Sequence, residues 1–162
     1  MAEINLAALR WVREVARVLE RGFVVTVDYG HTARDLYDPV RTKGTLMCYT
    51  GHRAGRAVYQ DIGLQDMTAH VDFSSLALTG ERAGLEVTGF TNQLSFLIGL
   101  GIEEELHGLD PESSECRSMI ALLHPSGMGR TFKVLVQHRG LPKPELAGLR
   151  HKAFFESALA PI

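Results

Sequence analysis

The order of elements near the amino terminus constrains the fold more than any other feature of this sequence. Over residues 6–21, apolar side chains recur at the spacing of one helix face, and Gly22 follows at the position of a C-terminal cap. Residues 23–27 then form an apolar, β-branched run without polar alternation, which is typical of a strand covered on both faces in a parallel sheet. A helix, a glycine and a buried strand in this order indicate an α/β fold.

The same order returns further along the chain. Asp72 precedes a helix pattern over residues 73–83, which Gly84 ends, and residues 85–90 form a strand pattern. Residues 132–136 form a third strand pattern. The chain therefore repeats the α/β unit within one sheet.

The first helix lies close to the start of the sequence, although a crossover helix needs a strand before it. We therefore expect residues 1–140 to be the later portion of a doubly wound domain whose N-terminal half is missing. Beyond Gly140, two prolines interrupt the pattern. Residues 141–162 are expected to form a C-terminal tail that is helical over residues 145–159.

Composition excludes several classes of function. The 162 residues suffice for one domain with a hydrophobic core, and 17 basic against 19 acidic side chains leave a net charge of −2. This balance argues against a nucleic acid or a membrane surface as the partner. Two cysteines without metal or redox spacing, and no secretory signal, favour a reducing compartment, so we expect a cytoplasmic protein.

The first candidate site is the sequence Asp28-Tyr29-Gly30-His31, directly after the buried strand. Ligands of open α/β sheets bind outside the carboxyl ends of the strands. Asp28 would orient a cationic or amine substrate or hold a proton acceptor, and Gly30 would let a ligand approach the backbone. The structural alternative is that Asp28 caps a turn and Tyr29 covers the sheet.

The second candidate site is the polar segment over residues 65–73. Asp66, Thr68 and His70 alternate, so in an extended segment they would point to one side and face a substrate, with His70 able to exchange protons near neutral pH. The alternative assigns structural roles to His70 and Thr68, and for Asp72 a helix cap is the better interpretation.

Other motifs are weaker. Tyr49 and His52 would form an aromatic rim on the preceding loop, whose arginines are more simply solvated. The spacing of the histidines, Asp72 and Cys48 matches no zinc signature, so no metal is expected. The glycine pairs at residues 99–101 and 127–129 lack the strand-first context of a nucleotide loop and are expected at helix ends and turns.

Several short pieces match one family in order and spacing. They are Asp28-Tyr29-Gly30-His31, Gly44-Thr45-Leu46 with Tyr49 and His52-Arg53, residues 65–73, Gln93 with Phe96-Leu97, Gly99-Leu100-Gly101-Ile102, and Met128-Gly129 leading into residues 132–135. Together they resemble the C-terminal half of the MidA-like class I S-adenosylmethionine-dependent methyltransferases, a group that includes a mitochondrial complex I assembly factor which methylates a protein arginine.

The resemblance implies a partial Rossmann-like methyltransferase sheet with flanking helices. Residues 23–27 would correspond to the fifth strand of that sheet and residues 85–90 to the sixth. Residues 132–137 would correspond to the antiparallel seventh strand beside the fifth. The glycine-rich cofactor loop and the acidic ribose ligand of the family follow its first two strands, and this sequence has neither, so cofactor-binding residues are unassigned.

The implied activity is methyl transfer from S-adenosylmethionine to a protein side chain, with arginine as the suggested acceptor, in the mitochondrial matrix if the source is eukaryotic. The residues carried over are Asp28, Asp66 and His70 as catalytic groups, and Tyr29, Gly30, His31, Tyr49, His52 and Thr68 as substrate contacts.

The alternative function is a non-catalytic binding module or a split subunit. Such a chain would pair with itself as a homodimer or with a complementing N-terminal half, through an exposed sheet edge and an unpartnered helix face. A hydrolase using His70 and Asp66 ranks last, because Cys48 has no evident activating partner.

Overall fold

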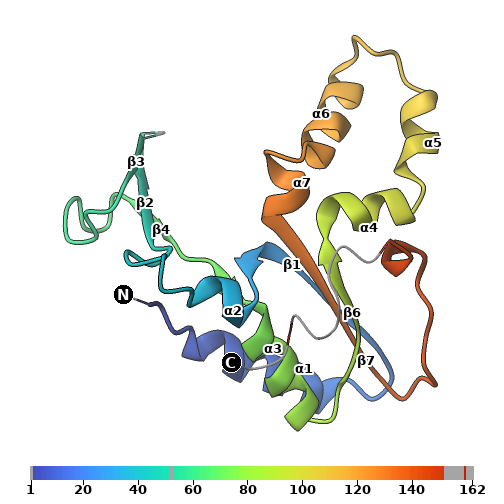
Figure 1. Ribbon diagram of the computed structural model, residues 1–162, viewed down its shortest axis with the longest axis horizontal. Coiled ribbons are helices and arrows are strands. Elements are labelled where there is room, and N and C mark those ends of the chain that lie inside the picture. The colour runs from blue at the N-terminus through green and yellow to red at the C-terminus, as the bar shows by residue number, and fades with distance from the viewer. Residues whose placement is uncertain (1, 52, 152–158, 160–162) are drawn as a thin grey trace.

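The computed structural model describes residues 2–51, 53–151 and 159. A four-stranded sheet with the order β5-β1-β7-β6 lies at its centre (Figure 1). Its strands are β1 (Gly22–His31), β5 (Val71–Asp72), β6 (Glu86–Asn92) and β7 (Phe132–Arg139). Strand β7 lies between β1 and β6 and runs antiparallel to both, which is the arrangement that the family resemblance implies.

Helices α1 (Leu6–Val18) and α3 (Phe73–Arg82) cover one face of this sheet. Helix α1 begins where the Asn5 side chain accepts a hydrogen bond from the Ala8 amide. Asp72 caps α3 by accepting from the Ser75 amide, so the predicted helix cap is confirmed. Between the helices and the sheet lies the hydrophobic core, whose fully buried members include Val12, Ala16, Phe73 and Leu135.

The opposite face of β1 is open, which corrects one prediction. Val24 is 8% exposed, whereas Phe23, Val25 and Val27 are 39%, 52% and 48% exposed. Along residues 22–29 the strand pairs antiparallel with β7, and it pairs in parallel only at Gly30 and His31, with β5. The prediction of a strand covered on both faces in a parallel sheet is therefore wrong in the described residues, because an apolar run carries no information about strand direction.

A second, three-stranded sheet extends from the first (Figure 1). It consists of β2 (Met47–Thr50), β3 (Arg53–Gly55) and β4 (Asp66–Thr68) in the order β3-β2-β4, paired antiparallel. We call residues 47–68 the arm. The sequence predicts only one short strand here, at residues 45–49, and a long loop elsewhere. Helix α2 (Ala33–Leu36) connects β1 to this region.

Four helices lie at the end of the sheet where β6 ends and β7 begins (Figure 1). Asn92 and Ser113 are residue types that favour the N-cap position and precede apolar segments of the sequence, and their side chains accept hydrogen bonds from backbone amides at the start of two of these helices. The helices are α4 (Gln93–Gly99), α5 (Ile102–His107), α6 (Ser114–Leu123) and α7 (Met128–Thr131). No helix in the described ranges is long and apolar enough to cross a membrane.

The C-terminal tail packs on the sheet. Residues 145–151 are not α-helical as predicted but contain the 3-10 helix η1 (Ala147–Leu149), and Phe154 and Phe155 lie outside the described residues. The Leu149 side chain fills the space beside Gly89 of β6. Leu159 is 8% exposed and belongs to the core. The described tail residues are thus part of the folded unit.

Candidate functional site

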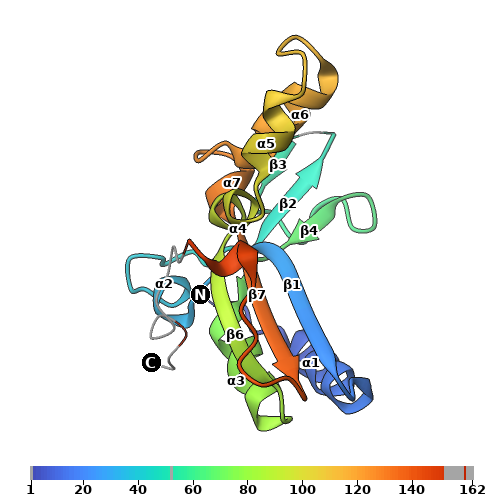
Figure 2. The ribbon, with the colours of Figure 1, turned by 90° about the vertical axis from the view of Figure 1, so that its right-hand side faces the viewer.

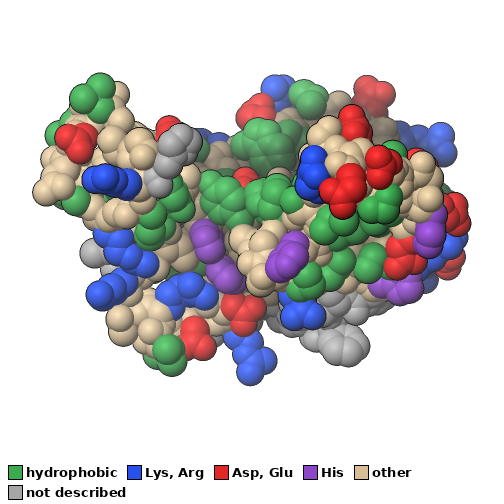
Figure 3. Space-filling view, turned by 90° about the horizontal axis from the view of Figure 1, so that it is seen from above, with side chains coloured by type: hydrophobic (Ala, Val, Ile, Leu, Met, Phe, Trp, Pro, Cys, Tyr) green, Lys and Arg blue, Asp and Glu red, His purple; other side chains and the backbone are tan. Residues whose placement is uncertain are grey.

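Three of the predicted site residues meet where β1 ends. The rings of His31 and His70 stack with centroids 4.9 Å apart and planes at 29°. The Tyr29 ring lies edge-on to His70 at 5.6 Å and to Phe132, the first residue of β7, also at 5.6 Å. We call Tyr29, His31, His70 and Phe132 the ring cluster. Seen from above, histidine side chains gather near the middle of this face beside hydrophobic and basic ones (Figure 3).

The backbone before β5 fixes the position of His70. Its amide donates a hydrogen bond to Thr45 Oγ1 at 3.0 Å. The Glu3 carboxylate in turn accepts hydrogen bonds from the Thr45 amide and hydroxyl and from the Leu46 amide. Burial raises the pKa of Glu3, but these hydrogen bonds outweigh it and the net pKa is lowered. A carboxylate before α1 therefore holds the loop that orients His70.

Both histidines of the ring cluster are neutral at neutral pH. Burial lowers the pKa of His31 to about 4, and the positive charges of Arg41 and Lys133 act in the same direction. Burial also lowers the pKa of His70, again with Arg41 and Lys133. His31 Nε2 and His70 Nδ1 are buried and accept or donate no hydrogen bond among the described residues. The pair therefore holds two buried ring nitrogens that have no hydrogen-bond partner within the described part of the chain.

Asp28 lies beside this pair. Its Oδ1 accepts a hydrogen bond from the Tyr29 amide at 2.8 Å, and its charge raises the pKa of His70 against the effect of burial. Strand pairing sets Asp28 opposite Lys133 of β7. Asp28 lies within β1 and therefore does not cap the turn that the structural alternative predicts, and the opposed charges place an anion and a cation at one end of the sheet.

Sequence reasoning missed Lys133 and Phe132. Lys133 is 9% exposed, and its ammonium group donates to the backbone carbonyls of Arg130 and Thr131. Burial lowers its pKa, although Asp35 opposes that shift. The signal available in the sequence is a single lysine within the otherwise apolar run over residues 132–136, where a charge is costly unless it has partners.

The structure places the other predicted residues elsewhere. Asp66 and Tyr49 lie opposite each other in the arm, where both are exposed, and Thr68 lies opposite Met47. Among the described residues, neither Asp66 nor Tyr49 makes a hydrogen bond or ring contact with the ring cluster. The predicted alignment of Asp66, Thr68 and His70 does not continue past β4, which ends at Thr68. His52 lies outside the described residues.

Close packing explains why residue 30 is a glycine, and the sequence alone does not reveal this packing. A Cβ at this position would lie 2.3 Å from the Val71 carbonyl oxygen and 2.8 Å from the Phe73 ring. The close approach is therefore between β1 and β5. A ligand contact at Gly30 stays a prediction.

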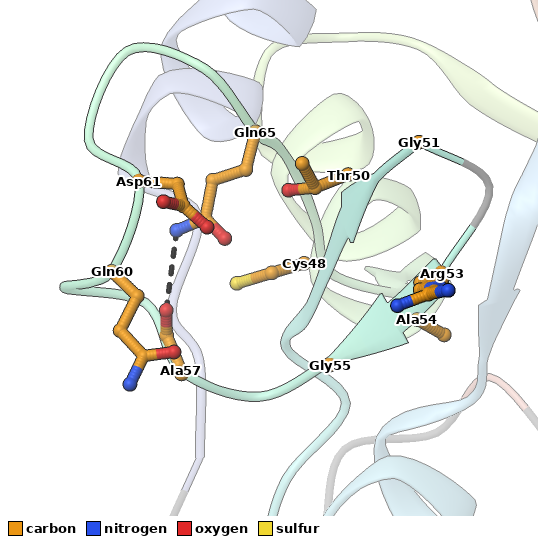
Figure 4. A pocket seen from close by; sticks show the side chains of 10 residues that line it. All are labelled: Cys48, Thr50, Gly51, Arg53, Ala54, Gly55, Ala57, Gln60, Asp61 and Gln65. Atoms are coloured by element: carbon orange, nitrogen blue, oxygen red, sulfur yellow. Dashed lines mark hydrogen bonds between the residues drawn. The ribbon is translucent and has the colours of Figure 1, made fainter.

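Two open cavities flank the site. One, of about 520 Å³, is lined by His31 and by the residues after it, Asp35, Asp38, Val40 and Arg41. The other, of about 540 Å³, lies in the arm between β2, β3 and the loop over residues 57–65 (Figure 4). In the arm cavity, Gln65 Nε2 donates to the Ala57 carbonyl at 3.2 Å, and none of the ring cluster residues lines it. His31 of the ring cluster lines the first of these cavities, and His70 lines a smaller one of about 60 Å³ together with Glu3, Tyr37 and Asp72.

The glycine pairs have the helix-end and turn positions that the sequence predicts. Gly101 adopts a left-handed conformation before α5, and Gly127 precedes α7. A Cβ at Gly99 would meet the Ala147 carbonyl oxygen at 2.5 Å, and one at Gly129 the Leu123 carbonyl oxygen at 2.4 Å. Gly99 and Gly129 therefore serve close backbone packing, whereas a Cβ at Gly101 would meet nothing within 4 Å. Within the described ranges, no three His, Cys, Asp or Glu side chains assemble as a metal site.

Comparison with known proteins identifies the family. Residues 1–91 match the family model described as "putative S-adenosyl-L-methionine-dependent methyltransferase". A COG1565 superfamily structure from Burkholderia thailandensis, bound to S-adenosyl-homocysteine, is 35% identical, with a TM-score of 0.86 over 93% of this chain. A second structure, of an uncharacterized COG1565 protein from Burkholderia thailandensis, is 35% identical over the same share with a TM-score of 0.87.

Both solved relatives are much longer than this chain. This chain spans 40% and 41% of the two solved chains. No curated protein matches it. The family model nevertheless covers more than half of the sequence, and the structural match covers nearly all of it. The chain therefore belongs to the COG1565 family of S-adenosyl-L-methionine-dependent methyltransferases.

Proposed function

We propose that this chain is the substrate-facing, C-terminal portion of a methyltransferase that transfers a methyl group from S-adenosylmethionine to a protein side chain, with arginine as the first acceptor to test. The observation that carries the proposal is the 35% identity over 93% of the chain to a COG1565 protein bound to S-adenosyl-homocysteine. That compound is what remains of S-adenosylmethionine after the methyl group has left.

The residues at the end of β1 would orient the methyl acceptor. Methyl transfer needs the nucleophile in line with the methyl group and its lone pair free. His31, whose ring is neutral because burial lowers its pKa to about 4, lines the cavity of about 520 Å³ at this end of β1 and would contact the acceptor there. The Asp28 carboxylate would attract a cationic side chain to the same place. Tyr29 would shape the wall of the site, and Tyr49, His52, Asp66 and Thr68 stay proposed contacts from the arm.

The described residues do not fit a complete cofactor site. Gly99 and Gly129 face backbone carbonyls at distances that leave no room for a ligand, and no strand in the described ranges leads into a glycine-rich loop and helix. We therefore propose that S-adenosylmethionine contacts lie mainly in the part of the COG1565 fold that this chain does not cover.

Isothermal titration with S-adenosylmethionine and S-adenosyl-homocysteine tests the proposal. The chain would be titrated alone and together with the portion of the Burkholderia thailandensis protein that it does not cover. We expect binding only in the second case, followed by methylation of arginine-containing peptides. Binding by the chain alone would contradict the assignment of the cofactor site to the remaining portion.

A non-catalytic binding module is the second candidate function. The exposed apolar side chains on the open face of β1 favour it, because such surfaces mark interaction sites. A combined protein that binds S-adenosyl-homocysteine but methylates no peptide or protein would support this candidate. Its partner would be a second copy of the chain or the complementing portion.

A further inference from the structure

The open cavity beside α2 is lined by side chains of both charges. It has a volume of about 520 Å³, and its lining residues are His31, Asp35, Asp38, Val40 and Arg41. We call it the α2 cavity. Figure 2 shows α2 to one side of the molecule and the strands of the arm to the other, and none of these five residues lines the arm cavity. The two cavities are therefore separate surfaces.

Local hydrogen bonds hold both carboxylates of the α2 cavity in place. Asp35 Oδ2 accepts from the Thr32 hydroxyl at 2.9 Å, at the start of α2. Asp38 Oδ1 accepts from the Val40 amide at 2.8 Å, and the Asp38 carbonyl accepts from the Arg41 amide at 2.8 Å. Each carboxylate keeps a second oxygen for which the described residues supply no donor. Two positioned carboxylates can thus accept hydrogen bonds from a cationic ligand.

Arg41 supplies the opposite charge. Its Nε donates to the Asp35 backbone carbonyl at 3.2 Å, and its terminal nitrogens have no hydrogen-bond partner in the described part of the chain. No ion pair among the described residues links Arg41 to Asp35 or Asp38. His31 adds no charge at neutral pH, because burial lowers its pKa to about 4. Two anions and one cation therefore line one cavity without pairing with one another.

A ligand that satisfies these groups carries a positive and a negative group side by side. A guanidinium would donate to the oxygens of Asp35 and Asp38, and a carboxylate would accept from the terminal nitrogens of Arg41. A metal ion fits less well, because in the described ranges the two aspartates and His31 do not assemble as a metal site. The volume lies in the range of small-molecule sites, so two neighbouring side chains of a polypeptide would fit.

We propose that the α2 cavity selects the sequence around the methyl acceptor. Asp35 and Asp38 bind the cationic acceptor side chain, and Arg41 binds the carboxylate of an acidic residue next to it. The inference rests on the proposed function, in which the acceptor contacts His31 in this cavity. It adds a preference for an arginine beside Asp or Glu over an arginine beside a neutral or basic residue. Because both carboxylates are exposed to water, each contact has a modest effect.

Capped peptides test the α2 cavity on the whole chain, without any cofactor. The charged peptide holds arginine followed by glutamate, and two matched peptides replace the arginine by neutral citrulline or the glutamate by glutamine. NMR titration would report the amides of residues 31–41 and the dissociation constants. We expect these amides to shift with the charged peptide, and each matched peptide to bind about three- to tenfold more weakly.

Substitutions in the cavity assign the two charges. Asp38→Asn keeps an oxygen that can accept from the Val40 amide, so it should weaken binding of the charged peptide about three- to tenfold and leave the citrulline peptide unchanged. Arg41→Gln should remove the difference between the glutamate and glutamine peptides. Asp110→Asn is the matched control, because Asp110 accepts from the Glu112 amide in the same way on the loop between α5 and α6. This variant should bind like the parent chain.

Circular dichroism of each variant checks its fold, and the amide shifts of the parent chain test the site without any variant. No binding of the charged peptide, equal binding of the three peptides, shifts confined to other residues, or unchanged binding by both cavity variants would each overturn the proposal. The chain combined with the remaining portion of the Burkholderia thailandensis protein separates the two claims. Methylation of arginine peptides regardless of the neighbouring residue would support the proposed function and contradict the cavity assignment. Charge-dependent binding without any methylation would support the cavity assignment and contradict the proposed function.

Discussion

At the level of single residues, the ring cluster shows how burial selects a protonation state. His31 and His70 stack on each other, and burial together with neighbouring cations lowers the pKa of both. A protonated pair would set two positive charges within one stacking distance. The same packing that forms the site therefore keeps its histidines neutral and ties folding to pH.

We predict that the free energy of unfolding rises as pH increases from 4 to 6.5. The pKa of His31 is about 4 in the folded chain and 6.5 for the unperturbed side chain of the unfolded chain, so in this window the unfolded chain binds a proton that the folded chain does not. Acid therefore favours unfolding, and the stabilisation is complete only above pH 6.5. Urea titrations at several pH values, with an NMR titration of the His31 ring, would measure this.

His31→Asn should remove part of the pH dependence, with His70 accounting for a further part. His107→Asn, at an exposed position on α5, is the control and should leave the slope unchanged. A His31→Asn slope equal to that of the parent would contradict the prediction.

Glu3→Gln should lower the free energy of unfolding by about 1–2 kcal/mol. The carboxylate accepts from Thr45 and Leu46 amides, whereas the glutamine amide would turn an NH₂ group toward one of these donors. Chemical denaturation would measure the loss. Glu14→Gln is the control, because its exposed carboxylate pairs with exposed Arg17, and we expect a change below about 0.5 kcal/mol. Equal effects of the two substitutions would refute the role of Glu3.

At the level of elements, the contact between β1 and β5 depends on Gly30. We predict that Gly30→Ala destabilises the chain by about 1–3 kcal/mol, because its Cβ would collide with the Val71 carbonyl, which cannot move without separating the strands. Thermal unfolding would measure the effect. At Gly55, in β3, a Cβ would meet nothing within 4 Å, so Gly55→Ala should stay within about 0.5 kcal/mol of the parent. Equal thermal stability of the two variants would contradict the prediction and show that β5 can move away from β1 without loss of stability.

Elements with local signals could be predicted from the sequence, and those that depend on distant pairing could not. Asp72, Asn92 and Ser113 cap helices because a short polar side chain reaches its own helix amides, which is local chemistry. The direction of β1 and the open face beside it depend on which strands reach it from elsewhere, and periodicity carries no such information. The family resemblance, rather than the pattern, supplied the antiparallel place of β7.

The site residues likewise fall into those that the sequence could predict and those that it could not. Tyr29 and His31 follow one strand, and His70 precedes the neighbouring strand, so the topology brings them together. Tyr49 and Asp66 instead pair with each other in the arm, whose short strands have weak sequence signals. The place of Lys133 in the site could not be predicted, because the apolar strand pattern explains its segment without giving the lysine a role.

At the level of the whole molecule, the tail is part of the fold. We predict that Leu149→Ala lowers the free energy of unfolding by about 1–2 kcal/mol, because the half-buried side chain fills the space beside Gly89. A chain ending at residue 140 should lose more, since it also lacks buried Leu159. Denaturation curves would show both effects. Leu64→Ala, at a 79% exposed position, is the control, and its free energy of unfolding should stay within about 0.5 kcal/mol of the parent's. A 1–140 chain as stable as the parent would instead show that the tail contributes nothing to the stability of the folded unit.

The place of β7 between β1 and β6 has a consequence for synthesis on the ribosome. Gly22 pairs with Arg139, so the two strands that make the centre of the sheet lie at nearly opposite ends of the described chain. Until Arg139 leaves the exit tunnel, β1 and β6 cannot both pair with the complete β7 strand. Until Phe132 has left it, the ring contact between Tyr29 and Phe132 cannot form. Contacts of such long sequence separation form slowly. The nascent chain thus completes its sheet and its ring cluster in one late step, and a ribosome that stalls before residue 132 leaves a chain with neither.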